Sequence, residues 1–389
     1  MRSLPLRLAA AALLVLPAAA GAQGTLSTQG FGYPTGQMST RTLGTGGALA
    51  EIDPLSAINP ASIINLGASV LYFQAEPEYR TIRVGGASDR STVARYPLMA
   101  AGVPLRSDLY AGLSVSNLLD RSFETVARGS QVVGGNTITS TNTFKSDGAV
   151  GDLRLALSWA PRSWLHLGLA GHAISGDNRL TSTQRFDDTT RYTGIVDTST
   201  VTYVGNAFSG GVELYTGRYG VVAASYRRGG PLSLKHGDTT LSIARVPDRL
   251  ALSAAYLGIR GTSIAVRTAR EQWTDLRGLG SAGLPISDKW DTSVGADVLG
   301  PRFAGRAVQL RAGARWRTLP FGVRPILAGG GFGASADVTE KSYSLGAGTL
   351  LARGRAALDV AGIRASRRSS ATSVQEDAWT LSIGVTVRP

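Results

Sequence analysis

The chain has 389 residues, a formal net charge of +13 at pH 7 and no cysteine. The absence of cysteine excludes disulfide bonds and thiolate metal sites. The basic balance is almost entirely arginine, and since the arginines are scattered with no basic run longer than two residues, we expect no nucleic-acid binding.

The N-terminus has the organisation of a secretory signal peptide. Basic residues precede an apolar run over 8–20, and small residues, Ala-Gly-Ala, follow at 20–22. The apolar run is shorter than the roughly 18–20 residues that span a bilayer, and Pro17 interrupts it. We therefore expect residues 1–22 to be a cleaved signal peptide and the mature chain to be exported.

Residues 23–65 are rich in glycine and show no sustained period of strand or helix. The stretch GTGGALA within them has some features of a phosphate-binding loop. No clear strand precedes it and no Lys-Ser/Thr pair follows it, so we expect no nucleotide site.

The rest of the chain, residues 66–389, repeats a period of two that is typical of β-strands. The stretch WTLSIGVTVR at 379–388 alternates apolar and small polar side chains, and LRLALSW at 153–159 alternates in the same way. Successive side chains of a strand point to opposite sides, so each strand has one apolar face and one polar face. Fourteen such strands are predicted, near 66–80, 93–104, 109–118, 149–160, 164–175, 203–216, 219–229, 245–258, 262–272, 289–299, 305–317, 338–350, 354–365 and 376–388.

The predicted connections alternate strictly in length. Tight turns are expected at 106–108, 161–163, 216–218, 259–261, 300–305 and 352–354. Long polar loops are expected at 81–92, 119–148, 176–202, 230–244, 273–288, 318–337 and 366–375. Short periplasmic turns and longer outer loops in alternation are typical of an outer-membrane barrel. We therefore predict an all-β fold, a transmembrane antiparallel β-barrel of about 14 strands in the cell outer membrane.

The lumen of such a barrel is wider than the barrel's own side chains can fill. A compact N-terminal plug, or hatch, is the simplest way to fill it. We therefore expect residues 23–65 to form the plug and residues 66–389 to form the barrel.

Several charged side chains fall on the polar, lumen-facing side of the predicted strands. The candidates for the lumen or for ligand contact are Arg154, His166, His172, Asp291, Asp297, Arg311, Arg315 and Asp359, with Arg317 on the same face. One interpretation is a paired network that holds the plug and offsets desolvation. The other is that one or two of the arginines remain available to a carboxylate or another anionic head group.

The sequence offers little for catalysis or for a cofactor. His166 and His172 share a face, but at roughly 3.3 Å per residue they lie about 20 Å apart, too far to share a metal ion. No Gly-x-Ser-x-Gly motif is present. We expect no enzyme, no metal and no cofactor, and the catalytic alternative is a lipase that combines one of these histidines with a serine of a neighbouring strand.

The segment GTGGALAEIDPLSAINPASI at 44–63 resembles the N-terminal hatch of the FadL/TodX family of outer-membrane channels for long-chain fatty acids and aromatic hydrocarbons. The resemblance rests on the glycine-rich start, on Asp53 and above all on Asn59, Pro60 and Ala61. The late strands over 308–321 and 344–361 also look like those of the family. The resemblance implies a fourteen-stranded barrel with an N-terminal plug. The chain departs from many outer-membrane proteins in that it lacks an aromatic residue at its C-terminus.

The resemblance also implies passive uptake of hydrophobic or amphipathic small molecules, with capture near the outer loops, plug rearrangement and release sideways or into the periplasm. The expected partners are outer-membrane lipids, lipopolysaccharide and hydrophobic small-molecule cargo, with a protein partner possible at the periplasmic or outer face. Two alternatives stay open. The first is a barrel of the same fold that serves a secretion system as a PorV-type partner-binding component, and the second is a general porin for polar solutes.

Overall fold

The computed structural model describes residues 26–389 except 85, 134–135, 280–283, 304, 326 and 328–330. The predicted signal peptide, residues 1–22, lies outside the described residues. No helix among those described is long and apolar enough to cross a membrane.

One antiparallel sheet contains all the strand segments that the structure describes. They are β1 (Val70–Val84), β2 (Ala87–Arg95), β3 (Leu98–Arg106), β4 (Leu109–Asp120), β5 (Phe123–Val133), β6 (Asn136–Arg162), β7 (Leu165–Phe186), β8 (Ile195–Thr216), β9 (Gly220–His236), β10 (Thr239–Arg245), β11 (Arg249–Ile259), β12 (Thr262–Glu271), β13 (Lys289–Phe303), β14 (Arg306–Val323), β15 (Ala336–Leu351), β16 (Ala356–Ser369) and β17 (Gln375–Val387).

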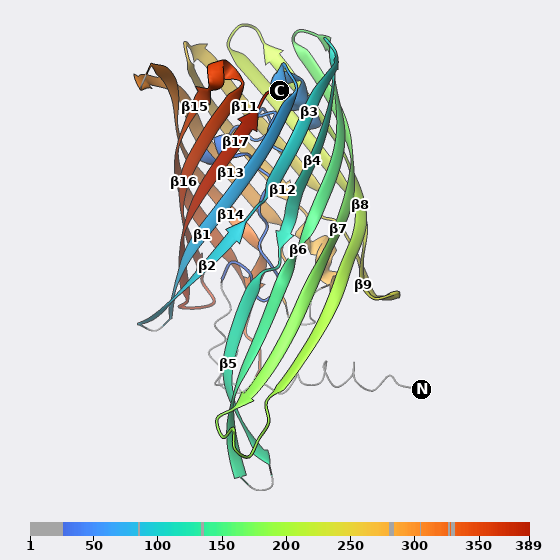
Figure 1. The fold of residues 1–389 in the computed structure, drawn as a ribbon, viewed down its shortest axis with the longest axis vertical. Coiled ribbons are helices and arrows are strands. Elements are labelled where there is room, and N and C mark those ends of the chain that lie inside the picture. The colour runs from blue at the N-terminus through green and yellow to red at the C-terminus, as the bar shows by residue number, and fades with distance from the viewer. Residues whose placement is uncertain are drawn as a thin grey trace.

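The sheet closes into a barrel because its first and last strands pair with one another (Figure 1). The β1–β17 pairing runs from Leu71 opposite Val387 to Arg83 opposite Gln375. Three strands of the barrel are each split into two segments: β1 pairs with both β2 and β3, β6 with both β4 and β5, and β9 with both β10 and β11. The described residues thus form a closed transmembrane barrel of 14 antiparallel strands, as predicted.

Two of the three breaks in the split strands coincide with a proline. Between β2 and β3 the chain carries Tyr96 and Pro97, and the register with β1 shifts there by one residue, as in a β-bulge. Proline has no backbone N–H to donate to a ladder, which favours a break at this point. Pro247 lies between β10 and β11, where the register with β9 does not shift.

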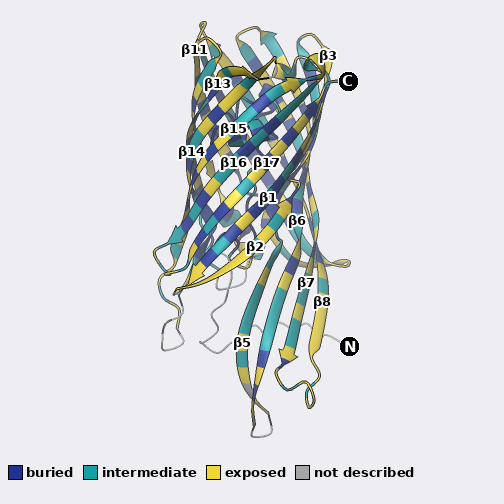
Figure 2. Ribbon diagram, turned by 60° about the vertical axis from the view of Figure 1, so that its left-hand side comes forward, coloured by how far each residue is buried: buried dark blue, intermediate teal, exposed yellow. Residues whose placement is uncertain are grey.

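The predicted two-faced pattern is present along the strands (Figure 2). On β17, Trp379, Leu381, Ile383, Val385 and Val387 are 36–56% exposed on the outside. The alternate residues Ser382 and Thr386 are buried on the inside. An apolar outer face and a polar inner face are what a barrel surrounded by lipid requires.

The prediction of loops was wrong for three of the long polar segments. Residues 119–148, 176–202 and 230–244 were expected as loops, but most of them lie in β5–β10. These segments extend the hairpins, and β5–β8 project well beyond the body of the barrel (Figures 1 and 2). Threonine and valine are frequent in them, and β-branched residues favour strands even where the surface is polar. We call this end of the barrel the projecting end, and the end with the six tight turns the short-turn end.

Residues 26–66, here called the N-terminal segment, contact the inward-facing side chains of the barrel. The segment contains the short helix α2 (Thr40–Gly44) and the 3-10 helix η1 (Pro60–Leu66). Two further 3-10 helices, η2 (Trp273–Leu279) and η3 (Ala352–Gly354), lie in connections between strands. α2 contacts β14–β17, and η1 contacts β6–β8 on another part of the wall.

Candidate functional site

The predicted plug motif, Asn59-Pro60-Ala61, forms the start of η1. The Asn59 side-chain oxygen accepts a hydrogen bond from the Ala61 backbone N–H at 3.0 Å, and Pro60 occupies the first position of the helix. This is a standard helix start, since asparagine caps free N–H groups and proline there loses no helical bond. The Asn59 amide also donates to the Glu51 carbonyl at 2.8 Å, and Ser158 of β6 donates to the Ala61 carbonyl at 2.7 Å. The motif therefore fixes η1 against the barrel wall.

Pairs of glycines in the wall make room for the backbone of the N-terminal segment. Gly168 of β7 and Gly211 of β8 are ladder partners. A Cβ atom on Gly168 would lie 2.3 Å from the Ala61 nitrogen, and one on Gly211 would lie 1.8 Å from the Asn59 side-chain oxygen.

A second pair, Gly295 of β13 and Gly313 of β14, is also directly opposed. A Cβ on either residue would lie 2.1 Å from the backbone of Thr45. Only glycine permits so close an approach of two backbones. The backbone of the N-terminal segment thus packs closely against the wall at two places. Neither glycine pair was predicted from the sequence.

Tyr33 anchors the beginning of the segment toward the projecting end. Its backbone bridges to Asp120, the last residue of β4. Its hydroxyl group contacts Arg317 and donates to Glu340 at 3.2 Å. Burial raises the pKa of the Tyr33 phenol above its usual value, although nearby Arg317 lowers it, so the phenol stays protonated. Four guanidinium groups lie 4.7–5.8 Å from the centroid of its ring: Arg80, Arg95, Arg317 and Arg367.

Acidic side chains balance these four arginines. Their carboxylate partners within 4.0 Å are Glu78, Asp120, Glu340 and Glu376. All of these charged residues are buried. Buried ion pairs of this kind hold only while every member stays paired, because an unpaired buried charge is costly.

Glu51 is the acidic anchor in the middle of the segment. It is fully buried and lies 2.5 Å from Arg249 of β11 and 3.3 Å from Arg267 of β12. Arg267 also pairs with Asp291 at 3.1 Å, and Asp291 pairs with Arg315 at 2.6 Å. The predicted candidates Asp291 and Arg315 are therefore in one buried network that ends on the N-terminal segment.

Three further predicted candidates, Asp297, Arg311 and Asp359, form ion pairs toward the short-turn end. Arg311 contacts Asp297 at 3.2 Å and Asp359 at 2.5 Å, and Arg41 of α2 contacts Asp297 at 3.1 Å. Arg41 is partly exposed, whereas the other three are buried. Together with Arg315 and Arg317, Arg311 is thus engaged by carboxylates, which favours the interpretation of a paired network for these three arginines.

The two predicted histidines have separate partners. His166 of β7 contacts Glu213 at 3.1 Å, and Glu213 accepts a hydrogen bond from Asn65 of η1 at 2.8 Å. His172 contacts Asp152 through Nδ1 at 2.9 Å. Each histidine therefore supports an acidic residue that binds the N-terminal segment or its surroundings. No group of three or more metal-ligating side chains occurs among the described residues.

His172 also approaches a serine of the neighbouring strand. Its Nε2 atom lies 2.8 Å from the Ser209 hydroxyl, so Asp152, His172 and Ser209 have the connectivity of a hydrolase triad. A triad additionally needs an accessible nucleophile and hydrogen-bond donors for an oxyanion. His172 and Ser209 are buried, and neither lines the two cavities described below. Gln37 of the N-terminal segment donates to Asp152 at 2.8 Å, so the cluster acts as a further anchor.

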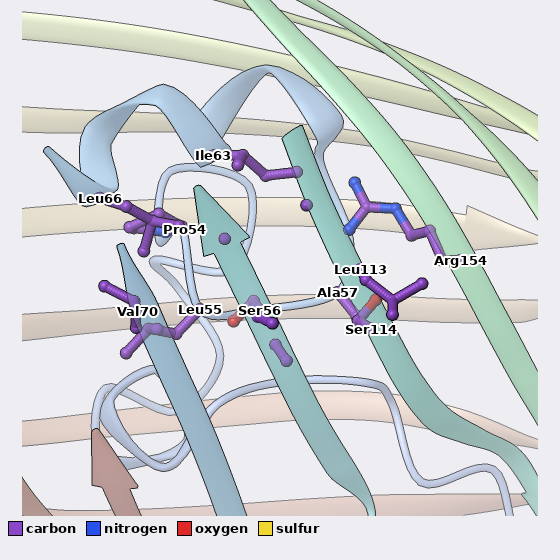
Figure 3. Close-up of a pocket in the computed structure, with 14 residues that line it drawn as sticks. Pro54, Leu55, Ser56, Ala57, Ile63, Leu66, Val70, Leu113, Ser114 and Arg154 are labelled. Atoms are coloured by element: carbon purple, nitrogen blue, oxygen red, sulfur yellow. The ribbon is translucent and has the colours of Figure 1, made fainter. Parts of the chain in front are cut away.

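A small cavity lies between η1 and the wall formed by β1, β3, β4 and β6 (Figure 3). It encloses about 20 Å³, enough for one water molecule. Apolar residues predominate in its lining, among them Leu55, Ile63, Leu66, Val70 and Leu113. Arg154 of β6 and Ser114 of β4 supply its charged and polar side.

A larger cavity of about 400 Å³ lies nearer the short-turn end. Charged residues Arg41, Asp53, Arg311, Asp359 and Arg388 line it together with apolar ones. Four residues line both cavities: Pro54, Leu55, Leu66 and Val70. The two cavities are therefore neighbours that share part of one wall.

Sequence reasoning placed every predicted lumenal residue on the inner face but missed several anchors. The sequence analysis did not predict three of the anchors: Glu51, Arg249 and Arg267. The apolar–polar alternation of β11 and β12 nevertheless places both arginines on the inner face. No sequence pattern predicts the contacts of Tyr33, because the arginines around its ring come from strands that are far apart in the sequence.

No protein-family model matches the chain, and no curated protein is similar enough in sequence to be matched. Solved structures do match. The crystal structure of a Pseudomonas aeruginosa FadL homologue has a TM-score of 0.67 at 11% sequence identity, covering 92% of this chain and 99% of that one. The Pseudomonas putida toluene transporter TodX has a TM-score of 0.57 at 13% identity, covering 90% and 98%. A deltaS2S3 mutant of the TodX monoaromatic hydrocarbon channel has a TM-score of 0.60 at 13% identity, covering 90% and 99%. The chain therefore has the fold of the FadL homologue and of TodX, which confirms the resemblance seen in the sequence at the level of the fold.

Proposed function

We propose that this chain is an outer-membrane channel for passive uptake of hydrophobic or amphipathic small molecules of the fatty-acid or hydrocarbon class. The apolar outer face of the barrel fits contact with outer-membrane lipids and lipopolysaccharide. In this proposal the short-turn end faces the periplasm and the projecting end faces outward. Residues 1–22 serve as the cleaved signal peptide.

The N-terminal segment acts as the plug of this channel. Its anchors lie on opposite parts of the wall, since Thr40 contacts Ser382 of β17 whereas Glu51 contacts Ser225 of β9. Two of its contacts, from Glu51 to Arg249 and to Arg267, are buried ion pairs. A segment held in this way is suited to local side-chain movement rather than to departure from the lumen as a whole.

One observation carries the proposal: a cavity of mainly apolar lining lies inside a lumen that is otherwise rich in paired charges. A pocket whose lining is mainly apolar suits an apolar cargo in such a place. The neighbouring cavity continues from it toward the short-turn end, so the shared residues Leu66 and Val70 mark the passage between them. The similar structures are named as a toluene transporter and a monoaromatic hydrocarbon channel, which supports the same class of cargo.

Uptake measurements test the proposal. Labelled oleate and toluene, with a labelled sugar as the polar control, are offered to cells that lack their own hydrophobic channel and that assemble this protein in the outer membrane. We expect uptake of the hydrophobic probes above the empty cells and no uptake of the sugar. Equal uptake of the sugar would indicate a general porin. No uptake of any probe by the folded barrel would favour the partner-binding alternative.

The Gly102→Val variant adds a test of the cavity. A Cβ on Gly102 would lie 2.3 Å from a terminal carbon of Leu66, so valine pushes the Leu66 side chain into the cavity. Toluene uptake is expected to fall in this variant. Gly362→Val is the matched control, because Gly362 is also in a strand but has no atom near the position of its Cβ.

A further inference from the structure

The tight turns at the short-turn end share one kind of charged residue. Each of the six turns carries an arginine, and one more arginine directly follows each of the last two turns. Asp108 is the one acidic residue in the six turns, and they contain no lysine. We call these exposed arginines the arginine ring: Arg106, Arg162, Arg218, Arg260, Arg302, Arg306, Arg353 and Arg355.

The arginine ring surrounds the end of the barrel. The turns join β3–β4, β6–β7, β8–β9, β11–β12, β13–β14 and β15–β16, and these hairpins follow one another around the closed sheet. The remaining interval lies between β17 and β1, where the C-terminus lies at the same end (Figure 1). There Arg388 donates to the Gly354 carbonyl at 3.3 Å. The positive charge is thus distributed around the whole circumference rather than gathered in one patch.

Most of the arginine ring lacks a carboxylate partner within the protein. Within the described part of the chain, Arg106 is the one member that forms an ion pair, with Asp108 at 2.9 Å. The guanidinium group of Arg162 donates to the Pro161 carbonyl at 3.1 Å, a neutral acceptor that leaves its charge uncompensated. The ring therefore presents its positive charge to whatever surrounds this end of the protein.

The connections at the projecting end have no comparable excess of positive charge. The β7–β8 connection contains Asp187, Asp188 and Arg191. The turn between β9 and β10 contains Asp238 and neither arginine nor lysine. The basic character is therefore a property of the short-turn end and not of exposed connections in general.

Exposed apolar side chains lie beside the arginine ring. Leu105, Trp164, Tyr219 and Ile259 are 50–54% exposed, and each lies within two residues of a ring arginine. Aromatic and aliphatic side chains next to arginines are typical of a membrane interface, where the apolar group enters the bilayer and the guanidinium group reaches the head groups. A membrane also surrounds a barrel on all sides, as the ring does. Both observations favour lipid over a soluble acidic protein as the partner.

We propose that the arginine ring binds the phosphate groups of anionic phospholipids in the membrane leaflet at the short-turn end. A guanidinium group presents parallel N–H donors that match two phosphate oxygens. Lipids of net negative charge are preferred to zwitterionic ones, because each arginine near an anionic surface adds to the attraction. The proposal rests on the orientation given under the proposed function, in which this leaflet is the periplasmic one and consists of phospholipid rather than lipopolysaccharide.

Native mass spectrometry of the purified full chain tests the proposal. The folded protein in detergent is offered equal amounts of phosphatidylglycerol, phosphatidylethanolamine and a phosphorylated lipid A, and the retained copies of each lipid are counted. The ring variant combines four substitutions in four different turns: Arg218→Gln, Arg260→Gln, Arg302→Gln and Arg353→Gln. The matched control removes four exposed arginines of the projecting end: Arg90→Gln, Arg128→Gln, Arg185→Gln and Arg191→Gln. Gel mobility before and after heating shows that each variant is folded.

We expect the unmodified protein and the control variant to retain phosphatidylglycerol at least about three times as often as phosphatidylethanolamine. In the ring variant this ratio is expected to fall to within about 1.5-fold of equal retention. Sodium chloride at about 1 M should lower the ratio of the unmodified protein in the same direction, since salt screens exposed charges.

Three results would overturn the proposal. Equal retention of the two phospholipids by the unmodified protein would leave a soluble acidic protein as the partner of the ring. An equal fall of the ratio in the ring variant and the control variant would show that the turns hold no particular site. A preference for lipid A over phosphatidylglycerol that disappears in the ring variant would assign the arginines to the opposite leaflet.

Toluene uptake separates this proposal from the proposed function. If the unmodified protein takes up no toluene but prefers phosphatidylglycerol through the arginine ring, the transport function fails and the lipid site stands. If toluene is taken up and the unmodified protein retains both phospholipids equally, the transport function stands and the lipid site is wrong.

Discussion

Gly168 and Gly211 face each other across the β7–β8 ladder, and the Asn59-Pro60-Ala61 turn occupies the space that their side chains would fill. The Asn59-Pro60-Ala61 motif, from which the sequence predicted a hatch, thus packs directly against two glycines of the barrel wall. The same arrangement recurs where Gly295 and Gly313 face Thr45. These contacts position η1, and with it the apolar cavity.

Filling one of these glycine positions should displace the N-terminal segment. In Gly211→Leu the new side chain meets Asn59 and Pro60, so we expect a loss of stability of about 1–3 kcal/mol, typical of overpacking. Single-channel recordings in planar bilayers should then show higher ion conductance than the unmodified barrel. The control is Gly362→Leu, which has open space at its Cβ. An unchanged conductance and melting temperature in Gly211→Leu would contradict the seating contact.

Glu51→Gln tests the ion pairs of the segment. The change leaves Arg249 and Arg267 without this carboxylate, and breaking a buried pair typically costs about 3–5 kcal/mol. We expect a lower melting temperature and more frequent channel openings. Glu124→Gln on the exposed surface of β5 removes the same charge elsewhere and should change neither quantity. A stability equal to that of the control would show that Glu51 is not an anchor.

Tyr33→Phe isolates the hydroxyl group of the aromatic anchor. The ring stays among four guanidinium groups, but the bonds to Glu340 and Arg317 are lost. A buried hydrogen bond left without its partner costs about 1–3 kcal/mol, so the melting temperature should fall by a corresponding amount. Tyr219→Phe provides the comparison, since Tyr219 is half exposed in the tight turn between β8 and β9. Identical melting curves for the two variants would argue against a role for the Tyr33 hydroxyl.

Ser209 should not behave as a catalytic serine. Although it lies 2.8 Å from His172, both residues are buried and line neither cavity. We expect a fluorophosphonate probe to leave the purified protein unlabelled, with a known serine hydrolase as the positive control. Labelling that disappears in Ser209→Ala would establish a catalytic site where we infer an anchor.

The sequence predicted the strands well because their signal is local. The alternation in LRLALSW and WTLSIGVTVR placed Leu155 and Trp379 on the outer face and Arg154 on the inner face, and the structure agrees. At the projecting end, polar composition did not distinguish loops from strands. Residues 119–148 and 176–202 are polar yet mostly extended, because pairing between long hairpins satisfies their backbone groups.

The candidate site was harder to predict because its contacts join residues far apart in the chain. Arg311, Arg315 and Arg154 look alike in sequence, since all three follow the same inward alternation. Only the closed barrel shows that Asp359 and Asp291 engage the first two. Among the described residues no hydrogen bond reaches the Nε and Nη2 atoms of Arg154, and this too can be seen only in the assembled lumen.

The central claim is that cargo passes between η1 and the wall, and a reversible lock tests it most directly. The chain has no cysteine, so Leu66→Cys combined with Gly102→Cys gives one designed pair at a contact where the two side chains would meet. Toluene uptake by this double variant is measured under oxidising conditions and again after a reductant, and thiol titration confirms the bond. We expect uptake to fall on oxidation and to recover on reduction. The same uptake in both states would contradict passage along this contact.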